Sequence, residues 1–146
     1  MKQLTCAALI ALAPIALPMA AMAEGQTHHV AIHVDEGDPP LMNMALNNAQ
    51  NVAAYYASQG DKVVIELVAY GPGLAILLEG SPMKDRIAMM SLELDDISFS
   101  ACANTMAAME KKLGHKMTLL DEAEVVPSGV VRLIELQEQG YAYVRP

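Results

Sequence analysis

The sequence has no tryptophan, one phenylalanine and only two cysteines among its 146 residues. Aromatic side chains are the surfaces on which nucleic-acid bases stack, so their scarcity argues against binding of single strands. No run of Lys and Arg is longer than two residues, and the sequence contains 17 acidic and 9 basic residues. Nucleic acids and anionic membranes attract basic surfaces, so neither is expected as a partner.

Several catalytic fingerprints are also missing. The chain has no CxxC pair, no P-loop and no glycine-rich dinucleotide motif, and no Ser-His-Asp combination stands out. The sequence therefore gives no support for a thioredoxin, a nucleotide-dependent or NAD-dependent enzyme, or an ordinary hydrolase. No cofactor is expected.

The first 23 residues have the pattern of a secretion signal. One lysine is followed by an apolar stretch over about residues 4–17 and by an A-x-A cleavage site at 21–23. The apolar stretch is broken by prolines and is shorter than the roughly 20 residues of a membrane-spanning helix, although an uncleaved anchor is the alternative interpretation. We therefore expect residues 1–23 to be removed and residues 24–146 to form one periplasmic or secreted domain without a membrane anchor. Cleavage would leave Cys102 as the single thiol.

Hydrophobic periodicity predicts that strands and helices alternate along the mature chain. Strands are expected at 28–36, 62–71, 97–102, 117–120 and 141–144. Helices are expected at 41–59, 74–80, 81–96, 105–113 and 127–139. This alternation predicts an α/β three-layer sandwich with a mainly parallel, flavodoxin-like sheet, in which ligands bind beyond the carboxyl ends of the strands.

Cys102 lies at such a carboxyl end, directly before a predicted helix. Asn104 is expected to cap that helix, and unpaired N–H groups at the helix start would stabilise a thiolate. The acidic residues at 35–38 would act in the opposite direction and raise the pKa of the thiol. A buried structural cysteine is the alternative interpretation.

The ends of the first two strands supply further candidate ligand-binding residues, namely Asp35, Tyr70, Gly71 and Gly73. The two glycines either let an anion approach backbone N–H groups or only form a turn, and Asp35 is a ligand or a turn residue. His28, His29 and His33, together with the methionines, suggest copper, but core packing and local hydrogen bonds account for them better. No metal site is expected.

The predicted helix at 41–59 carries no charge. Its polar side chains are amides, from Asn43, Asn47, Asn48, Gln50 and Asn51. A helix facing solvent in so acidic a protein would ordinarily carry charges. The pattern therefore favours a helix packed against another subunit in a homo-oligomer.

Four segments carry a resemblance to a known family. They are HVDEGDPPLMNMALNNAQN (33–51), VIELVAYGPGL (64–74), FSACANTM (99–106) and VPSGVVRLIELQEQGYAYVRP (126–146). Through them the chain resembles the DsrE/DsrF-like family of YchN-like fold, over about residues 30–144. The resemblance implies homo-oligomers, commonly trimers or hexamers, and a persulfide-carrying cysteine after a central strand, at the position of Cys102. The predicted export departs from the best understood members, which act in a cytoplasmic sulfur relay.

Three functional hypotheses follow. In the first, the protein is an exported sulfur-handling protein in which Cys102 accepts or carries a persulfide. The helix start at Thr105–Met106 would stabilise this persulfide, Asn104 would orient it, and a sulfur donor or acceptor protein is the partner. In the second, it is a non-catalytic oligomeric protein that binds a small ligand or assists assembly, and Cys102 is structural. In the third, Cys102 and His33 form a redox or metal sensor.

Overall fold

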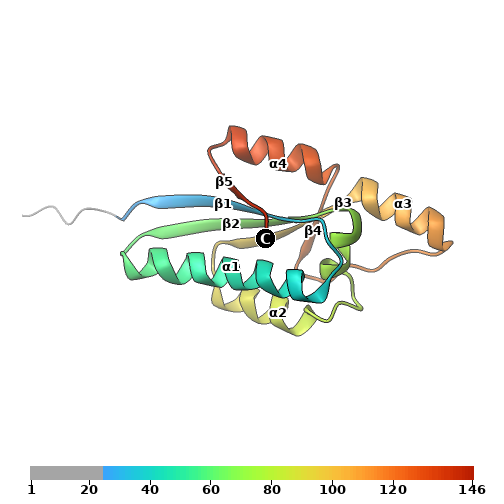
Figure 1. Ribbon diagram of the computed structural model, residues 1–146, viewed down its shortest axis with the longest axis horizontal. Helices are drawn as coiled ribbons and strands as arrows, with labels where there is room; N and C mark the ends of the chain where they lie inside the picture. Colours follow the sequence, from blue (N-terminus) through green and yellow to red (C-terminus); the bar gives the residue numbers. More distant parts are fainter. Residues whose placement is uncertain (1–24) are drawn as a thin grey trace, which may run out of the picture.

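The computed structural model describes residues 25–146, so the predicted signal peptide lies outside the described residues. Strands and helices alternate along this part of the chain (Figure 1). In order they are β1 (Thr27–Val34), α1 (Pro39–Ser58), β2 (Lys62–Ala69), the 3-10 helix η1 (Gly71–Leu77), α2 (Lys84–Glu93), β3 (Ile97–Cys102), α3 (Ala103–Leu113), β4 (Ala123–Val126), α4 (Gly129–Glu138) and β5 (Ala142–Val144). Within residues 25–146, no helix combines the length and hydrophobicity that crossing a bilayer requires.

The five strands form one parallel sheet in the order β4-β3-β2-β1-β5. The middle strand, β2, is buried from Ile65 to Ala69, as expected for an apolar strand that is covered on both faces. Val34 of β1 pairs with Ala69 of β2, which in turn pairs with Ala101 of β3. This register brings the carboxyl ends of three neighbouring strands to one level at the same edge of the sheet.

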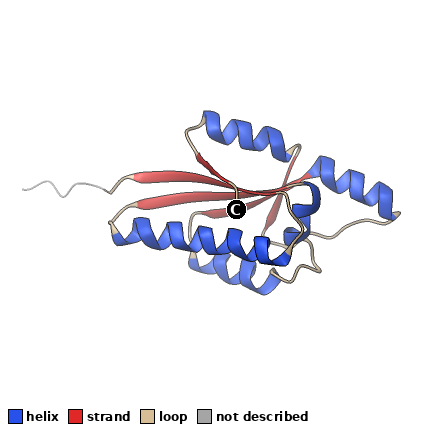
Figure 2. Ribbon diagram, in the orientation of Figure 1, coloured by secondary structure: helices blue, strands red, loops and turns tan. Residues whose placement is uncertain are grey.

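Helices cover both faces of the sheet, which confirms the predicted three-layer α/β sandwich (Figures 1 and 2). The main core lies on the face covered by α1 and α2, and its large buried side chains include Ile32, Met42, Leu46, Met90 and Phe99. The other face is covered by α4, over a much smaller apolar cluster of Ala31, Val68, Leu133 and Leu136. The connections explain this division: right-handed crossovers from β1 to β4 run in one direction, and the connection through α4 runs back to β5.

The segment between α3 and α4 differs from the prediction. The prediction of a strand at 117–120 is wrong. The strand β4 occupies Ala123–Val126, and Leu119 forms only an isolated antiparallel bridge with Leu78. β4 lies at the edge of the sheet, where Glu124 and Val125 are exposed. An edge strand of this kind lacks the continuous apolar run of a buried strand, so pairing with β3 decides its position.

The uncharged helix α1 has a polar partner within the same chain. Arg86 of α2 donates hydrogen bonds to the side-chain oxygens of Asn43, Asn47 and Gln50, at 2.7 Å for Asn47 and 2.6 Å for Gln50. The three amides follow one another at intervals of about one turn and so lie on one face of α1. Packing within the chain therefore accounts for three of the amides for which the sequence pattern favours a subunit interface.

Candidate functional site

Three of the candidate residues lie side by side at the carboxyl edge of the sheet. Cys102 is the last residue of β3, Tyr70 follows β2, and Asp35 follows β1. The register of the residues before them places all three at the same level on neighbouring strands. The sheet thus brings together residues that are 32 or more positions apart in the sequence.

Cys102 itself is the N-cap of α3. Its backbone is extended, with φ −72° and ψ 114°, and its Sγ accepts a hydrogen bond from the backbone N–H of Thr105 at 3.4 Å. The prediction that Asn104 caps the helix is therefore wrong: α3 begins at Ala103, and Asn104 is its second residue, with an exposed side chain. The cysteine is 4% exposed, so the sulfur is nearly covered by its surroundings.

A second helix, α4, begins in contact with Cys102. Gly129 is the first residue of α4 and is buried. A Cβ atom added at Gly129 would lie 2.8 Å from Cδ1 of Tyr70 and 3.3 Å from Cβ of Cys102. The N-terminus of α4 therefore packs directly on Tyr70 and Cys102, and only glycine permits so close an approach. Sequence reasoning missed Gly129, although Ser-Gly at a helix start is a visible signal.

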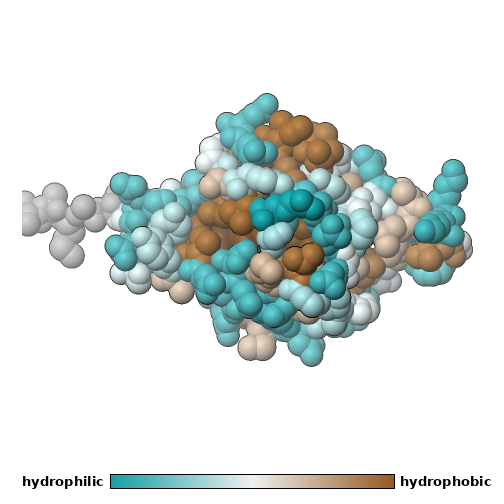
Figure 3. Space-filling model, viewed as in Figure 1, coloured by the Kyte–Doolittle hydropathy of each residue, from teal (hydrophilic) through white to brown (hydrophobic). Residues whose placement is uncertain are grey.

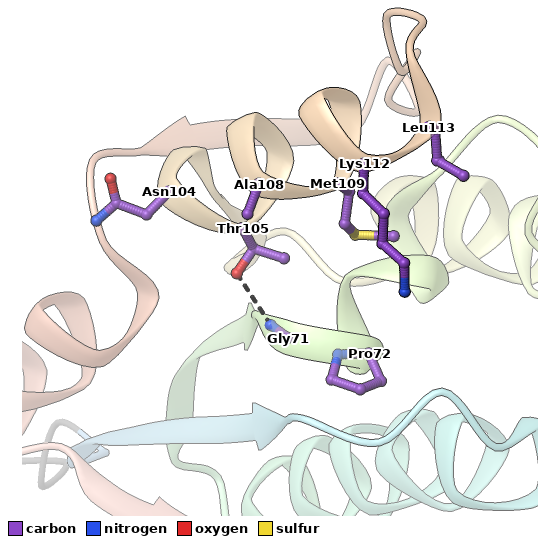
Figure 4. Close-up of a pocket in the computed structure, with 8 residues that line it drawn as sticks. All are labelled: Gly71, Pro72, Asn104, Thr105, Ala108, Met109, Lys112 and Leu113. Atoms are coloured by element: carbon purple, nitrogen blue, oxygen red, sulfur yellow. Dashed lines mark hydrogen bonds between the residues drawn. The ribbon is translucent and has the colours of Figure 1, made fainter.

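Thr105 connects the sulfur to the turn after β2. Its Oγ1 accepts a hydrogen bond from the backbone N–H of Gly71 at 3.0 Å (Figure 4). Because that oxygen is already an acceptor, its own O–H remains available to donate to Cys102. Sequence reasoning did not assign this role to Thr105, whose partner is 34 residues away.

These contacts lower the pKa of the Cys102 thiol below its ordinary value. Burial is the largest single influence and raises the pKa, because a thiolate loses hydration inside the protein. Hydrogen bonds from the Thr105 hydroxyl and from the backbone N–H groups of Gly129, Thr105 and Asn104 together outweigh burial. The lowered pKa agrees in direction with the prediction, but the start of α4 contributes as well as the start of α3.

The two glycines of the β2–η1 turn have structural roles. Gly71 has a φ of +53°, which favours glycine, and its N–H is occupied by Thr105. Gly73 is buried, and a Cβ atom there would lie 2.3 Å from the backbone oxygen of Val34. Close packing of η1 on the end of β1 therefore explains Gly73 without an anion.

Asp35 is paired with Arg145, which follows β5. Arg145 donates from Nε to Oδ1 and lies with Nη2 near Oδ2, both at 2.9 Å. The hydrogen bond from Arg145 is the main reason why the pKa of Asp35 is below its usual range. The guanidinium thus neutralises a carboxylate that the sequence analysis expected to oppose a thiolate.

His33 occupies a buried position beside this pair. It is 4% exposed, its Nδ1 lies 2.7 Å from the hydroxyl of Tyr143, and its ring stacks on Tyr70 with centroids 4.6 Å apart. Its Nε2 has no hydrogen-bond partner among the described residues, and the nearest carboxylate oxygen of Asp35 is 3.9 Å away. Within residues 25–146 no group of three His, Cys, Asp or Glu side chains is arranged to hold a metal ion.

An apolar groove lies between α3 and η1 (Figure 4). Its volume is about 580 Å³. It is lined by Gly71, Pro72, Asn104, Thr105, Ala108, Met109, Lys112 and Leu113. Thr105 belongs both to the groove wall and to the hydrogen bonds around Cys102, so the groove reaches the protein layer that covers the thiol.

Comparisons with known proteins place the chain in a family. The model of the DsrE/DsrF-like family matches residues 29–146. Among solved structures, the chain is similar to MTH1491, a protein of unknown function from Methanobacterium thermoautotrophicum, with 31% sequence identity and a TM-score of 0.70. That similarity covers 82% of this chain and 99% of MTH1491. No curated protein matches the chain. With a family match over nearly all of the described domain, the chain belongs to the DsrE/DsrF-like family.

Proposed function

We propose that the protein handles sulfur and that Cys102 accepts and carries it as a persulfide. The observation that supports this proposal is the position of Cys102, where the N-termini of α3 and α4 meet. Helix N-termini offer unpaired N–H groups and the positive ends of helix dipoles, which stabilise an anionic sulfur. Membership of the DsrE/DsrF-like family, which is associated with sulfur relay, is consistent with this role.

The proposed step is a transfer of sulfane sulfur without net oxidation. The Cys102 thiolate attacks the terminal sulfur of a donor persulfide, R–S–SH. The donor S–S bond breaks, R–S⁻ leaves with the bonding electron pair, and Cys102–S–SH forms. A thiolate is the attacking species in such exchanges, so the lowered pKa of Cys102 favours the step near neutral pH.

The groove between α3 and η1 is the surface at which we expect a donor or acceptor to approach. It is apolar and has a volume in the range of ligand-binding clefts. Thr105 lines this groove and also donates its backbone N–H to Cys102, which is 4% exposed, so we expect a small shift of α3 to open the sulfur to the groove. We expect the partner to be a protein or small-molecule persulfide.

The expected compartment is the periplasm or the extracellular space. This part of the proposal depends on the signal-peptide pattern in residues 1–23. In such a compartment most thiols are oxidised to disulfides, and a mature chain with a single buried cysteine has no partner for one. Burial thus protects Cys102 between sulfur transfers.

The burial of Cys102 also favours a second candidate function. A cysteine that is 4% exposed and caps a helix is well suited to a purely structural role. In that case the protein binds a small ligand or assists assembly, and the groove is its binding surface. Cys102 would then never carry sulfur.

The intact mass of the protein, purified from its native compartment with and without reductant, separates the two functions. A sulfur carrier shows an addition of about 32 Da that reductant removes. The control is Cys102→Ser, which keeps an oxygen at the N-cap and so preserves α3 while removing the acceptor. Wild-type protein that never carries reducible sulfur, even after incubation with a persulfide donor, would contradict the carrier function and leave the structural one.

A further inference from the structure

A carboxylate is buried on the sheet face that α4 covers. Glu66 lies in β2 and is 5% exposed. The hydroxyl of Ser100 donates to its Oε1 at 2.5 Å, and Arg132 of α4 donates from Nε to Oε1 at 2.7 Å and from Nη2 to Oε2 at 2.6 Å. Both oxygens of the carboxylate are therefore occupied, in a bidentate geometry that fixes the direction of the arginine.

Stability alone does not explain this pair. Taking the carboxylate of Glu66 out of water is costly, while the side chain of Arg132 stays 29% exposed, and apolar residues of similar size often stabilise such a contact equally well or better. The apolar contact between α4 and the sheet is small, because it consists mainly of Leu133 and Leu136 against Ala31 and Val68. Such a small contact does not fix the position of α4 along the sheet, and a bidentate ion pair does.

The position that the pair defines is that of the first turn of α4. The backbone N–H of Arg132 donates to the oxygen of Ser128 at 2.9 Å, which closes that turn. Gly129, at its start, contacts Tyr70 and Cys102. On the strand side, Ser100 and Cys102 are alternate residues of β3 and so face the same side of the sheet. Along α4, Arg132 is about one helical turn from Gly129, and along β3, Ser100 is two residues from Cys102. We call the cluster of Glu66, Ser100 and Arg132 the anchor.

We infer that Glu66, Ser100 and Arg132 are positioning residues that hold the N-terminus of α4 against the sulfur of Cys102. Loosening them lets the start of α4, where Gly129 packs on Cys102, move away from the sulfur and reduces the fraction of thiolate, while the groups of α3 stay in place. The biological meaning of the inference rests on the proposed sulfur carrier. The ionisation of Cys102 can nevertheless be measured whether or not the thiol carries sulfur. The positioning role and the sulfur-carrier function can therefore be contradicted separately.

The test is a pH titration of the thiolate in Arg132→Lys, followed by ultraviolet absorbance with Cys102→Ser as the blank. Lysine keeps the charge but cannot form the bidentate pair. The matched control is Arg86→Lys, because Arg86 also joins two elements through several hydrogen bonds but lies between α1 and α2. We expect Arg132→Lys to lower the thiolate fraction about two- to fivefold below the thiol pKa, the range that a helix N-terminus supplies. The control should match wild type.

Circular dichroism shows whether the folded protein is being titrated. If Arg132→Lys does not fold, Ser100→Ala takes its place, because it removes one hydrogen bond of the anchor and leaves the ion pair. A folded anchor variant with the wild-type titration overturns the inference, and so does an equal shift in Arg86→Lys. A shifted titration in a protein that never carries reducible sulfur would support the anchor and contradict the proposed function.

Discussion

At the scale of single residues, Gly129 decides how close a second helix comes to the thiol. Its missing side chain leaves room for Tyr70 and for Cβ of Cys102, which lie within 2.8 to 3.3 Å of the position that a Cβ atom would take. Contacts this short force neighbouring atoms to move, and here they include the backbone-proximal Cβ atoms of both neighbours. A single methyl group is thus enough to separate α4 from the sulfur.

Gly129→Ala is therefore expected to raise the pKa of Cys102 by a few tenths, because the start of α4 moves away from the sulfur. Overpacking should also lower the free energy of unfolding by about 1–3 kcal/mol. Gly80→Ala is the control, since nothing lies within 4 Å of a Cβ atom at Gly80. The thiolate titration and urea unfolding measure the two effects. An unchanged titration of folded Gly129→Ala would show that α4 does not act on the thiol.

Burial of His33 makes the stability of the folded protein depend on pH. Burial is the main cause that lowers its pKa below 6.5; the carboxylate of Asp35 raises it, and Arg145 lowers it further. The rings of Tyr70 and Tyr143 complete its surroundings. The unfolded chain therefore binds a proton at a higher pH than the folded protein does, and stability falls as pH drops below about 6.5 towards the folded pKa.

His33→Phe removes this proton-binding site and keeps the ring that stacks on Tyr70. We expect the variant to be less stable than wild type at pH 7.5 by about 1 kcal/mol, because the hydrogen bond with Tyr143 is lost. Its free energy of unfolding should then change less between pH 7.5 and 5.5. Urea unfolding at both values tests this, with His115→Gln, at an exposed position, as control. Equal pH dependence in His33→Phe and wild type would exclude His33 as the cause.

At the scale of elements, α1 and α2 are joined by one arginine and a row of amides. The guanidinium of Arg86 has four neutral acceptors on α1, three amide side chains and the backbone oxygen of Asn43, and none of them balances its charge. The absence of charge on α1 is therefore consistent with a helix whose polar face serves a neighbouring helix. An interface with another subunit through the same face would have to form around Arg86.

Asn47→Asp places a carboxylate beside Arg86 and is expected to stabilise the protein by about 0.2–1 kcal/mol, as surface ion pairs do. Asn51→Asp adds the same charge at an exposed position that does not accept a hydrogen bond from Arg86, and it should have little effect. Urea unfolding gives both values. If Asn47→Asp instead lowers stability or breaks an assembly, α1 is buried against a second subunit after all.

At the scale of the whole molecule, several exposed apolar side chains gather over one helix. The chain has a net charge of −8. A hydrophobic patch lies over α4, where Val130, Val131 and Ile134 are each about half exposed (Figure 3). α4 is the helix that covers this face of the sheet, so its outer side has no further layer of the described chain above it (Figure 1). This patch is better suited to bury against a second copy than the amide face of α1.

The predicted homo-oligomer is therefore expected to use α4. Ile134→Glu would place a charge in a closed interface and should reduce the assembly to monomers, because an unpaired buried charge is costly. Leu92→Glu is the control, since Leu92 is an exposed apolar residue of α2, on the other face of the sheet. Light scattering measures the mass of each form. A wild-type monomer would contradict the oligomer, and an oligomer that survives Ile134→Glu would exclude the α4 patch.

The sequence by itself determined the fold class and the position of Cys102 at a strand end. Both depend on local patterns: apolar periodicity separates strands from helices, and the order of these elements restricts the sheet to a parallel arrangement. The sequence pattern predicts Asn104 and not Cys102 as the cap of α3, because a sequence does not show at which residue the backbone leaves the extended conformation. It also misplaces the edge strand β4, because this strand has no buried apolar run.

Only the tertiary structure decided what surrounds the sulfur. The Gly71–Thr105 hydrogen bond joins residues 34 positions apart, and the Glu66–Arg132 pair joins residues 66 positions apart. In the sequence, Glu66 is one acid inside an apolar strand and Arg132 is one cation on a helix, and nothing marks them as partners. Such contacts arise when the sheet aligns its strands and α4 crosses back over them, so the environment of Cys102 depends on topology as much as on its own neighbours.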